Sequence, residues 1–327
     1  MAVGIIGTGS YLPEHVVTND DLAASVDTSD EWVIAHTGIK ERRRAAAGEV
    51  TSDLGQRAAR NSLEQAGLSL DQVDALVVAT SSPDKIQPST AAHVHEKLGL
   101  QAIPAFDVGA VCSGFVYALV TAAGLMTAFP QHEHVAVVGS EVYSRILDYE
   151  DRTTCVFFGD GAGAAVLGRV PEGYGILGCA LTTDSSHLDV VGVPAGGTQE
   201  PADADTVRDR RHFFHMDGRR VWEFATQAVP RVVKEALTDA GLDVRDIDLL
   251  ITHQANARLI EDIAGTCGLP MDRIPTTVER YGNTAAASVP ITLHEAHERG
   301  RLKRGDIVVL AAVGGGMTAG AVVLRWY

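Results

Sequence analysis

Residues 62–68 read Ser-Leu-Glu-Gln-Ala-Gly-Leu, and the run Val-Asp-Ala-Leu-Val-Val follows at residues 73–78. The same order returns at residues 236–242, Ala-Leu-Thr-Asp-Ala-Gly-Leu, followed by Ile-Asp-Leu-Leu-Ile-Thr at residues 247–252. Both copies read as a helix followed by a buried strand. Because self-similarity at a fixed interval is typical of internal duplication, the sequence predicts two equivalent halves.

Two further pairs of apolar segments support the duplication. Residues 134–138 pair with 306–310, and residues 163–167 pair with 320–324. Each half then reads helix, buried strand, helix, strand, long helix, strand, strand, and such alternation indicates sheets covered on both faces. We therefore predict an α/β fold in which two duplicated halves, residues 1–170 and 171–327, stack through their helices as a five-layer α/β/α/β/α sandwich.

Composition narrows the class of protein. The 327 residues are 46% hydrophobic, enough for one large or two medium cores. A net charge of −15 and a pI near 5.2 argue against nucleic acid and anionic membrane surfaces as partners. No Lys or Arg precedes Lys40, so no secretory leader is expected, and no apolar stretch is expected to span a membrane. Four cysteines without a CxxC spacing predict reduced thiols in a cytoplasmic protein.

Cys112 is the first candidate for chemistry. A strand-like run at residues 103–108 gives way to a helical, apolar run at residues 113–129. That places the thiol in the first turn of a helix, where unpaired N–H groups carry positive partial charge. Such a position can lower a cysteine pKa from roughly 8.5 towards 4–7, which would make the thiol a nucleophile. An inert core cysteine explains the local sequence equally well.

The duplication adds two polar side chains to this candidate. An offset of 172 positions pairs Cys112 with Thr284, beside Asn283, at the start of the matching helix of the second half. The offset of the first repeat places His253 at a strand end, and a pseudo-twofold axis would gather Cys112, His253 and Asn283 at one pocket. A converging thiol, imidazole and amide suit nucleophilic catalysis. Pro290 falls inside this second helix, where a proline typically costs about 3 kcal/mol unless a kink is wanted.

Six motifs carry a resemblance to a known family. They are Asp30-Glu31-Trp32 with Thr37-Gly38-Ile39, Val111-Cys112-Ser113-Gly114-Phe115, Asp151-Arg152-Thr153-Thr154 with Phe158-Gly159-Asp160-Gly161-Ala162-Gly163, His253-Gln254-Ala255-Asn256, Tyr281-Gly282-Asn283-Thr284, and Val313-Gly314-Gly315-Gly316. In order and spacing they resemble the 3-oxoacyl-ACP synthase III (KAS III) enzymes of the thiolase superfamily. One glycine cluster alone would be weak evidence, whereas all six in register over nearly the whole chain are specific.

The resemblance implies a thiolase-like fold and a Cys112–His253–Asn283 triad. Cys112 would accept an acyl group from acyl-CoA or from an acyl carrier, and malonyl on acyl carrier protein would then condense with it as carbon dioxide leaves. The backbone N–H groups of Cys112 and Gly315 would form the oxyanion hole. The family works as a homodimer and needs no cofactor or metal, because the malonyl carboxylate supplies the carbanion. The pathway would be the initiation of a fatty acid or polyketide chain.

The resemblance also assigns binding roles. The coenzyme A contacts would be Trp32, His36, Arg152 and Asn256; the acyl pocket residue would be Gln87; the carrier-docking residues would be Arg258, Arg219 and Arg220. Three positions depart from the family pattern. His36 stands where Arg is common, Gln87 stands where a bulky apolar residue often reaches the partner's acyl pocket, and Glu223 stands where a basic residue often meets the carrier. A basic patch of Arg208, Arg210, Arg211, Arg219 and Arg220 could compensate, or could simply be a solvated loop.

Other functions stay open at this level. A KAS III-like acyltransferase could move an acyl group to a carrier, hydroxyl or amine without decarboxylation, although Asn283 disfavours it. A non-catalytic synthase subunit is disfavoured by the intact triad. A degradative thiolase would want another cysteine after Cys267, and a hydroxymethylglutaryl-type synthase would want a carboxylate near Cys112, which no motif supplies clearly.

Overall fold

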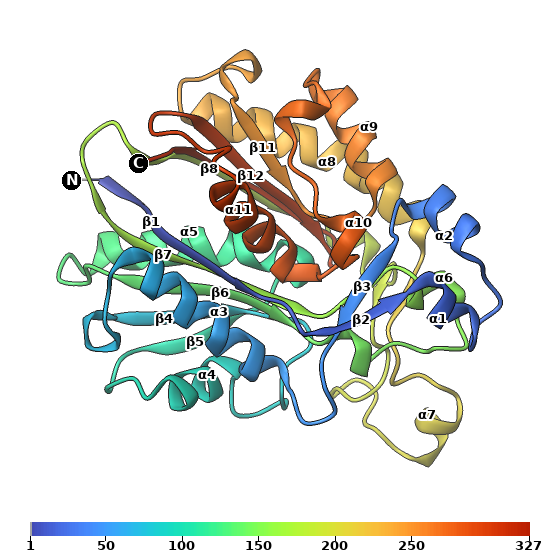
Figure 1. Ribbon diagram of the computed structural model, residues 1–327. Helices are drawn as coiled ribbons and strands as arrows, with labels where there is room; N and C mark the ends of the chain where they lie inside the picture. Colours follow the sequence, from blue (N-terminus) through green and yellow to red (C-terminus); the bar gives the residue numbers. More distant parts are fainter. Residues whose placement is uncertain (1) are drawn as a thin grey trace.

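The first of two central sheets is formed by the N-terminal half of the chain. The computed structural model describes residues 2–327, and Figure 1 shows their layered arrangement. The strands of this sheet are β1 (Ala2–Tyr11), β4 (Ala75–Ala79), β5 (Ala105–Val108), β6 (Val135–Glu141) and β7 (Gly161–Val170). They lie in the order β1-β7-β6-β4-β5. Strand β7 runs antiparallel to both of its neighbours, whereas β4 is parallel to β5 and β6.

The second sheet repeats this order with one strand fewer. Its strands are β8 (Gly175–Thr183), β11 (Leu249–Thr252), β12 (Ile307–Gly314) and β13 (Thr318–Arg325), in the order β11-β12-β13-β8. Strand β13 is antiparallel to both of its neighbours, as β7 is in the first sheet. The predicted boundary after residue 170 falls between β7 and β8, and on that basis we propose that the two halves divide there.

Helices form the other three layers. They are α3 (Thr51–Ala66), α4 (Thr90–Leu98), α5 (Gly114–Ala128), α8 (Gly218–Asp239), α9 (Ala257–Cys267) and α11 (Ser288–Glu298). Helices α3 and α4 cover the outer face of the first sheet, α8 and α9 cover the outer face of the second, and α5 and α11 lie between the sheets (Figure 1). The predicted five-layer arrangement is therefore confirmed.

Shorter elements surround one end of this sandwich. They are β2 (His15–Thr18), α1 (Asn19–Ala23), α2 (Asp30–Thr37), β3 (Glu41–Arg44), α6 (Arg152–Cys155), β9 (Val191–Gly192), α7 (Ala204–Arg208), β10 (His215–Met216) and α10 (Val278–Tyr281). Strands β2 and β3 form one hairpin, and β9 pairs with β10. Helix α7 lies within the polar stretch of residues 198–211 and projects from the sandwich (Figure 1).

The central helix α5 explains the longest apolar stretch. Val111–Ala128 has 18 residues and a mean hydropathy of 1.7, so this one segment of residues 2–327 is long and apolar enough to cross a membrane by length and composition alone. Phe115, Leu119 and Met126 of this helix are fully buried and pack with strands of both sheets. Its hydropathy is therefore that of a core helix enclosed between two apolar surfaces.

Two local expectations fail for identifiable reasons. The second half forms no counterpart of β5. Pro275 has no N–H to donate to a neighbouring strand, and the Gln254 side chain forms hydrogen bonds with the backbone of this segment instead. Its amide nitrogen donates to the Pro275 carbonyl at 3.4 Å and its oxygen accepts from Thr277 N at 2.8 Å. Pro290 causes no loss of helical hydrogen bonding, since α11 begins at Ser288 and Pro290 lies in its first turn.

Candidate active site

The candidate nucleophile lies in a strained turn before α5. A 3₁₀ turn, η2 (Val111–Ser113), precedes the helix, and Val111 adopts φ 48°, which is rare for a β-branched residue. Gly314 of β12 packs directly on this turn. A Cβ at that glycine would stand 2.6 Å from the Ala110 carbonyl oxygen and 2.9 Å from the Cys112 nitrogen. The second half of the chain therefore braces the turn that carries the thiol.

A matching turn in the second half corrects the counterpart of Cys112. The 3₁₀ turn η7 (Ala285–Ala287) precedes α11, and Ala285 adopts φ 44°, as Val111 does in the first half. This alignment pairs Cys112 with Ala286, two positions beyond the predicted Thr284. The offset of 172 that relates residues 134–138 to 306–310 does not hold here. The two turns are separated by the longer offset that relates residues 62–68 to 236–242.

Three predicted catalytic side chains line one small inner cavity. Cys112, His253 and Asn283 surround a space of about 50 Å³, together with Gly315. They come from η2, from the residue after β11, and from the segment between α10 and η7. The inner cavity is therefore assembled from both halves.

His253 is held as a neutral imidazole. It is 5% exposed, and burial lowers its pKa to about 4. The Ser288 hydroxyl lies 2.7 Å from its Nδ1 and also accepts from Gln254 N at 3.3 Å, so the hydroxyl can donate to Nδ1. This pattern leaves the proton on Nε2, where the imidazole can donate a hydrogen bond into the inner cavity.

Asn283 has an equally defined orientation. Its Oδ1 accepts from Ala285 N at 2.8 Å, which assigns the amide nitrogen to the opposite side. Its backbone is fixed as well, since Asn283 N donates to Phe157 O at 2.8 Å and Gly159 N donates to Asn283 O at 3.0 Å. The side chain can therefore donate from Nδ2 without any local rearrangement.

The predicted lowering of the Cys112 pKa is wrong. Burial raises the pKa of the thiol, the nearby Glu141 carboxylate raises it further, and its own backbone N–H offsets only part of the rise. Desolvation thus outweighs the helix terminus, and the thiol is protonated at neutral pH. The N-terminal end of α5 still favours the thiolate once the proton has left.

Glu141 is a buried carboxylate that sequence reasoning missed. It ends β6, is 0% exposed, and burial raises its pKa to about 7. Ser81 Oγ donates to it at 2.8 Å, Ser82 Oγ donates at 2.5 Å, and Ala286 N donates at 3.4 Å. A carboxylate therefore does lie near Cys112, contrary to expectation, but its oxygens are already engaged. The sequence signal that could have revealed this residue is an acidic side chain at the end of the largely apolar strand β6.

Aromatic side chains form one wall beside the thiol. Tyr143 stacks on Phe158 with ring centroids 4.6 Å apart, and Phe214 meets Phe158 edge-on at 5.0 Å. Cys112 packs against this cluster. An acyl group bound to the sulfur would therefore meet an apolar, rigid surface.

A larger outer cavity adjoins the inner one. It has a volume of about 470 Å³, and Met216, Val221, Leu259 and Asn283 line both spaces. Among the predicted binding residues, Trp32, His36, Asn256 and Arg219 line the outer cavity. The Arg152 guanidinium lies over the Trp32 ring, 5.0 Å from its centroid.

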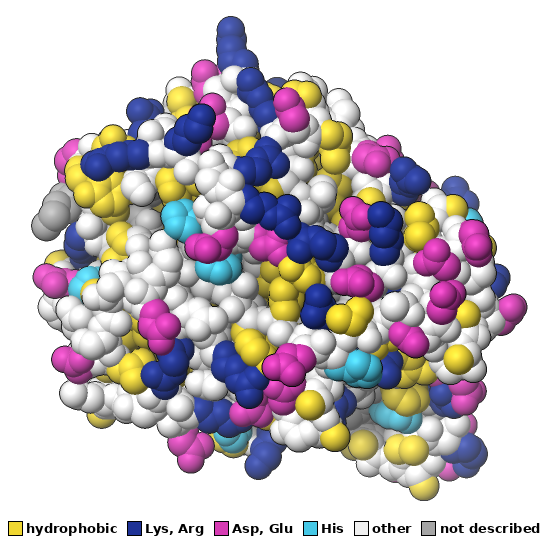
Figure 2. All heavy atoms as spheres, viewed as in Figure 1, with side chains coloured by type: hydrophobic (Ala, Val, Ile, Leu, Met, Phe, Trp, Pro, Cys, Tyr) yellow, Lys and Arg dark blue, Asp and Glu magenta, His cyan; other side chains and the backbone are white. Residues whose placement is uncertain are grey.

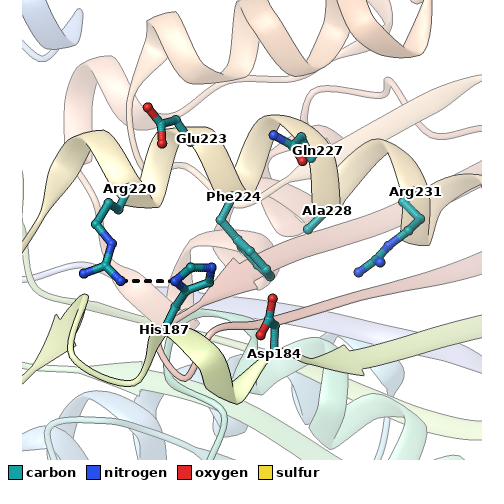
Figure 3. A pocket seen from close by; sticks show the side chains of 8 residues that line it. All are labelled: Asp184, His187, Arg220, Glu223, Phe224, Gln227, Ala228 and Arg231. Atoms are coloured by element: carbon teal, nitrogen blue, oxygen red, sulfur yellow. Dashed lines mark hydrogen bonds between the residues drawn. The ribbon is translucent and has the colours of Figure 1, made fainter.

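Other predicted binding residues lie elsewhere. Gln87 is exposed in the loop after β4 and does not line either cavity of its own chain. Arg258 pairs with Glu261 at 3.2 Å on the surface of α9. Arg220 turns away from the outer cavity towards His187 Nδ1 and Asp189, in a separate polar hollow beside α8 (Figure 3).

The suggested basic patch is neutralised by carboxylates. Each of its five arginines forms an ion pair: Arg208 with Asp205, Arg210 with Asp148, Arg211 with Glu200, Arg219 with Glu223, and Arg220 with Asp189. Figure 2 likewise shows basic and acidic side chains interspersed over much of one face. The solvated-loop interpretation fits these pairs better than a free basic surface does.

The comparisons with known proteins agree with this architecture. Residues 106–185 match the family 3-oxoacyl-[acyl-carrier-protein (ACP)] synthase III, and residues 237–326 match its C-terminal domain. A beta-ketoacyl-[acyl-carrier-protein] synthase III of Caldanaerobacter subterraneus subsp. tengcongensis is 45% identical over 326 residues, which cover 100% of this chain and 98% of that protein.

Solved structures show the same fold. The 3-oxoacyl-[acyl-carrier-protein] synthase III of Aquifex aeolicus has a TM-score of 0.91 at 40% identity, covering 99% of this chain and 100% of its own. The priming β-ketosynthase of the R1128 polyketide pathway has a TM-score of 0.91 at 31% identity, covering 99% and 96%. The fold is thus thiolase-like, and the enzyme class is that of the acyltransferases. The chain belongs to the 3-oxoacyl-[acyl-carrier-protein] synthase III family of condensing enzymes.

Proposed function

We propose that Cys112 accepts an acyl group from a thioester and passes it to a malonyl unit on acyl carrier protein. The observation that supports this most is the convergence of Cys112, His253 and Asn283 on the inner cavity, with hydrogen-bond donors free on Nε2 and Nδ2. Both donors suit the thioester oxygen that gains negative charge during decarboxylation. The product extends the acyl group by two carbons and starts a fatty acid or polyketide chain.

The first half-reaction is thioester exchange. The Cys112 sulfur bonds to the acyl carbon, the bond from that carbon to the donor sulfur breaks, and the thiol proton moves to the departing thiolate. Because the neutral His253 imidazole lines the same cavity, its Nε2 atom is placed to relay that proton after a change of tautomer. The N–H groups of Cys112 and Gly315 hold the oxyanion of the tetrahedral intermediate.

The second half-reaction makes the carbon–carbon bond. The bond between the malonyl α-carbon and its carboxylate breaks, carbon dioxide leaves, and the electron pair forms an enolate that His253 and Asn283 stabilise. This carbon attacks the acyl-enzyme carbonyl, the carbon–sulfur bond to Cys112 breaks, and the departing Cys112 thiolate takes a proton from solvent to restore the thiol. The chemistry needs no metal or organic cofactor, because the malonyl carboxylate provides the electron pair.

The remaining assignments are part of the same proposal. Trp32, His36, Arg152 and Asn256 form the entrance for the donor. Arg219, Arg220 and Arg258 meet the carrier protein by exchanging their own carboxylate partners for those of the carrier. Gln87 reaches the acyl pocket of a second subunit in a homodimer, which is consistent with the exposed loop where Ile86 is 81% exposed. Four free cysteines suit a reducing, cytoplasmic setting, and the charge of −15 disfavours nucleic acid and membrane partners.

Two measurements test this function. Intact-mass spectrometry after incubation with a panel of acyl thioesters should show one acyl adduct, which disappears in Cys112→Ala. Release of labelled carbon dioxide from malonyl-carrier protein should then match the amount of 3-oxoacyl product. An ester or amide product without carbon dioxide would favour the non-decarboxylating acyltransferase instead. Sedimentation analysis tests the homodimer.

A further inference from the structure

Two buried hydroxyls connect the nucleophilic turn η2 to the loop of residues 315–317, which joins β12 to β13. Ser113 Oγ lies 2.8 Å from Thr318 Oγ1, although 205 positions separate the two residues in the sequence. Ser113 follows the nucleophile and is 0% exposed, and Thr318 follows the loop and is 8% exposed. The contact therefore joins the two backbone segments that supply N–H groups to the oxyanion hole in the proposed mechanism.

The Ser113 hydroxyl does not have the role that serine usually has at the start of a helix. Ser113 is the N-cap residue of α5, where a hydroxyl ordinarily accepts a hydrogen bond from an N–H of the first turn. No such bond forms at this helix. The hydroxyl instead donates to the Ala110 carbonyl at 2.8 Å and contacts Thr318. Its hydrogen bonds thus run back into the strained turn and across to the second half of the chain.

The distances favour one direction for the two hydroxyl protons. Each hydroxyl has a single proton, and Thr318 Oγ1 lies 3.2 Å from the carbonyl oxygens of both Ala110 and Gly315. The two contacts at 2.8 Å are shorter, so Thr318 donates to Ser113, and Ser113 donates to the Ala110 carbonyl. That carbonyl also accepts from Ser113 N at 3.1 Å. A residue of the second half therefore orients the hydroxyl that closes the nucleophilic turn.

The 315–317 loop has little conformational freedom of its own. Gly316 adopts φ 125°, a conformation that glycine alone adopts readily. Met317 N donates to Asp184 O, and Asp184 N donates to Met317 O, both at 2.8 Å. Backbone pairing with Asp184 therefore holds one part of the loop, and Thr318 holds its end against η2.

Stability alone does not account for two hydroxyls in this position. Buried hydroxyls give up their hydration, and replacing both partners by apolar groups of similar shape is often neutral for stability. An alanine and a valine would fill nearly the same space. A hydrogen bond between the hydroxyls adds direction, because it fixes the relative position of two segments more closely than an apolar contact does.

We propose that Ser113 and Thr318 are positioning residues whose hydrogen bond sets the distance between the two N–H groups of the oxyanion hole. In the proposed mechanism, on which this inference rests, those groups belong to Cys112 and Gly315. Acylation and condensation both pass through a tetrahedral oxyanion, whereas decarboxylation develops its charge at other donors. The hydroxyl pair should therefore affect the first two reactions and spare the third.

Acylation and alkylation of Cys112 separate the oxyanion hole from the thiol. Thr318→Val keeps the shape of the side chain and removes its hydroxyl. Acylation by the thioester that acylates the wild type fastest should slow about tenfold, with an unchanged half-saturating concentration. Iodoacetamide alkylation forms no oxyanion and should keep its wild-type rate. Intact mass and peptide mapping follow both reactions at Cys112. Unchanged acylation, or an equal loss in the two reactions, would overturn the inference.

Further variants test whether the two hydroxyls act as a pair. Thr318→Ser keeps the hydroxyl and should acylate close to the wild-type rate. Ser113→Ala should resemble Thr318→Val, and the double variant should be no slower than either single variant, because the same contact is lost in all three. Ser62→Ala is the matched control, since Ser62 is also 0% exposed and its Oγ donates to the Ala59 carbonyl at 2.7 Å within α3. Additive losses, or an equal loss in Ser62→Ala, would refute the pair.

Stability measurements distinguish positioning from a merely structural role. The Ser113→Ala/Thr318→Val double variant should melt within about 3 °C of the wild type, because neither hydroxyl is left buried without its partner. Active-site titration should give the same number of reactive thiols per chain. A fall in that number that accounts for the whole loss of rate would show that the hydroxyls serve folding and not the oxyanion hole.

The condensation step gives a second readout. The enzyme is first acylated to completion, and malonyl-carrier protein is then added. A misplaced oxyanion hole slows attack of the enolate on the acyl carbonyl, so part of the enolate takes a proton from solvent and leaves as acetyl-carrier protein. The ratio of carbon dioxide to 3-oxoacyl product should rise from about one to about three in Thr318→Val, while carbon dioxide release keeps its rate. A ratio of one in this variant would contradict the inference. A wild type that is not acylated and releases no carbon dioxide would contradict the proposed function instead.

Discussion

The turns η2 and η7 have the same backbone conformation, but their N–H groups and side chains have different roles. Each begins with a non-glycine residue of positive φ, Val111 in one and Ala285 in the other, and each precedes a helix between the sheets. Each also packs on a glycine of the opposite half, Gly314 against η2 and Gly139 against η7. The duplicated scaffold is therefore symmetric down to its most strained residues.

The chemistry is divided unequally across this scaffold. Cys112 directs its thiol into the inner cavity, whereas its counterpart Ala286 is fully buried and gives its N–H to Glu141 at 3.4 Å. The second half supplies His253 and Asn283 instead. In the proposed mechanism one half would provide the nucleophile and the other the hydrogen-bond donors. Each turn packs against a glycine of the opposite half.

The largest effect should come from the nucleophilic turn. Cys112→Ala should reduce acyl transfer by about a thousandfold or more, because the covalent intermediate cannot form. Intact mass and product formation measure this. Cys267→Ala is the matched control and should retain the adduct. An adduct that persists in Cys112→Ala would show that another residue is the nucleophile and would refute the difference in function between the two turns.

Loss of a donor from the second half should leave acylation and stop condensation. Asn283→Asp keeps an oxygen for Ala285 N but removes the Nδ2 donor, so malonyl decarboxylation should fall by about 10²–10³. Acyl-enzyme formation should change far less. Carbon dioxide release and intact mass are compared on the same preparation. Equal losses in both steps would show that the halves do not divide the chemistry in this way.

Matched glycine variants compare the two packing contacts, Gly314 against η2 and Gly139 against η7. In Gly314→Ala the new Cβ would stand 2.6 Å from Ala110 O, and displacement of the thiol should lower activity by about 10². In Gly139→Ala the Cβ would stand 2.5 Å from Ala286 O, so stability should fall while activity per folded molecule is kept. Thermal melts and active-site titration separate the two effects. Similar activity losses would refute the functional asymmetry.

Ser288 should act as a positioning residue for His253. Ser288→Ala removes the partner 2.7 Å from Nδ1, so the imidazole loses its fixed tautomer and decarboxylation should slow about tenfold. The value of kcat should fall while KM and acyl-enzyme formation stay unchanged. Ser288→Cys, with a weak S–H donor, should give an intermediate rate. A change in KM alone would point to a structural role.

The smallest effect links Glu141 to the Cys112 thiol within the first half of the chain. Because the Cys112 pKa is raised, its thiolate fraction should grow about tenfold per pH unit through pH 9, and iodoacetamide alkylation should follow. Glu141→Gln removes a negative neighbour, which lowers the thiol pKa and should speed alkylation at pH 8 by about threefold. Peptide mapping confines the measurement to Cys112. A plateau below pH 8 in the wild type would contradict the raised pKa.

Much of the fold could be predicted from the repeat, because buried parallel strands and helices leave long apolar periods in the sequence. The missing strand near Pro275 could not be predicted from that pattern. It depends on the side chain of Gln254, twenty-one residues earlier, which occupies backbone groups that a strand would have used.

The candidate triad could be predicted because the motifs mark Cys112, His253 and Asn283 separately, and the offset of the first repeat places His253 at a strand end. The offset of 172 that led to Asn283 misses the true counterpart of Cys112 by two positions. The pKa shifts of these residues could not be predicted from the sequence. The pKa of Cys112 follows from desolvation by walls that the second half builds and from Glu141, whose partner serines lie about sixty residues away. The stacking of the His36 ring on the Trp32 ring follows helical spacing, whereas Arg152 over the Trp32 ring is a tertiary contact.

The positive φ of Val111 has a consequence for the order of folding. A left-handed valine is unfavourable in an isolated segment, so a nascent first half would relax the residue and turn its neighbouring sulfur out of alignment. The reactive geometry would arise only when β12 docks, late in maturation. Incomplete molecules would then carry a solvated cysteine, without the aromatic wall and the His253 and Asn283 side chains that surround it in the inner cavity.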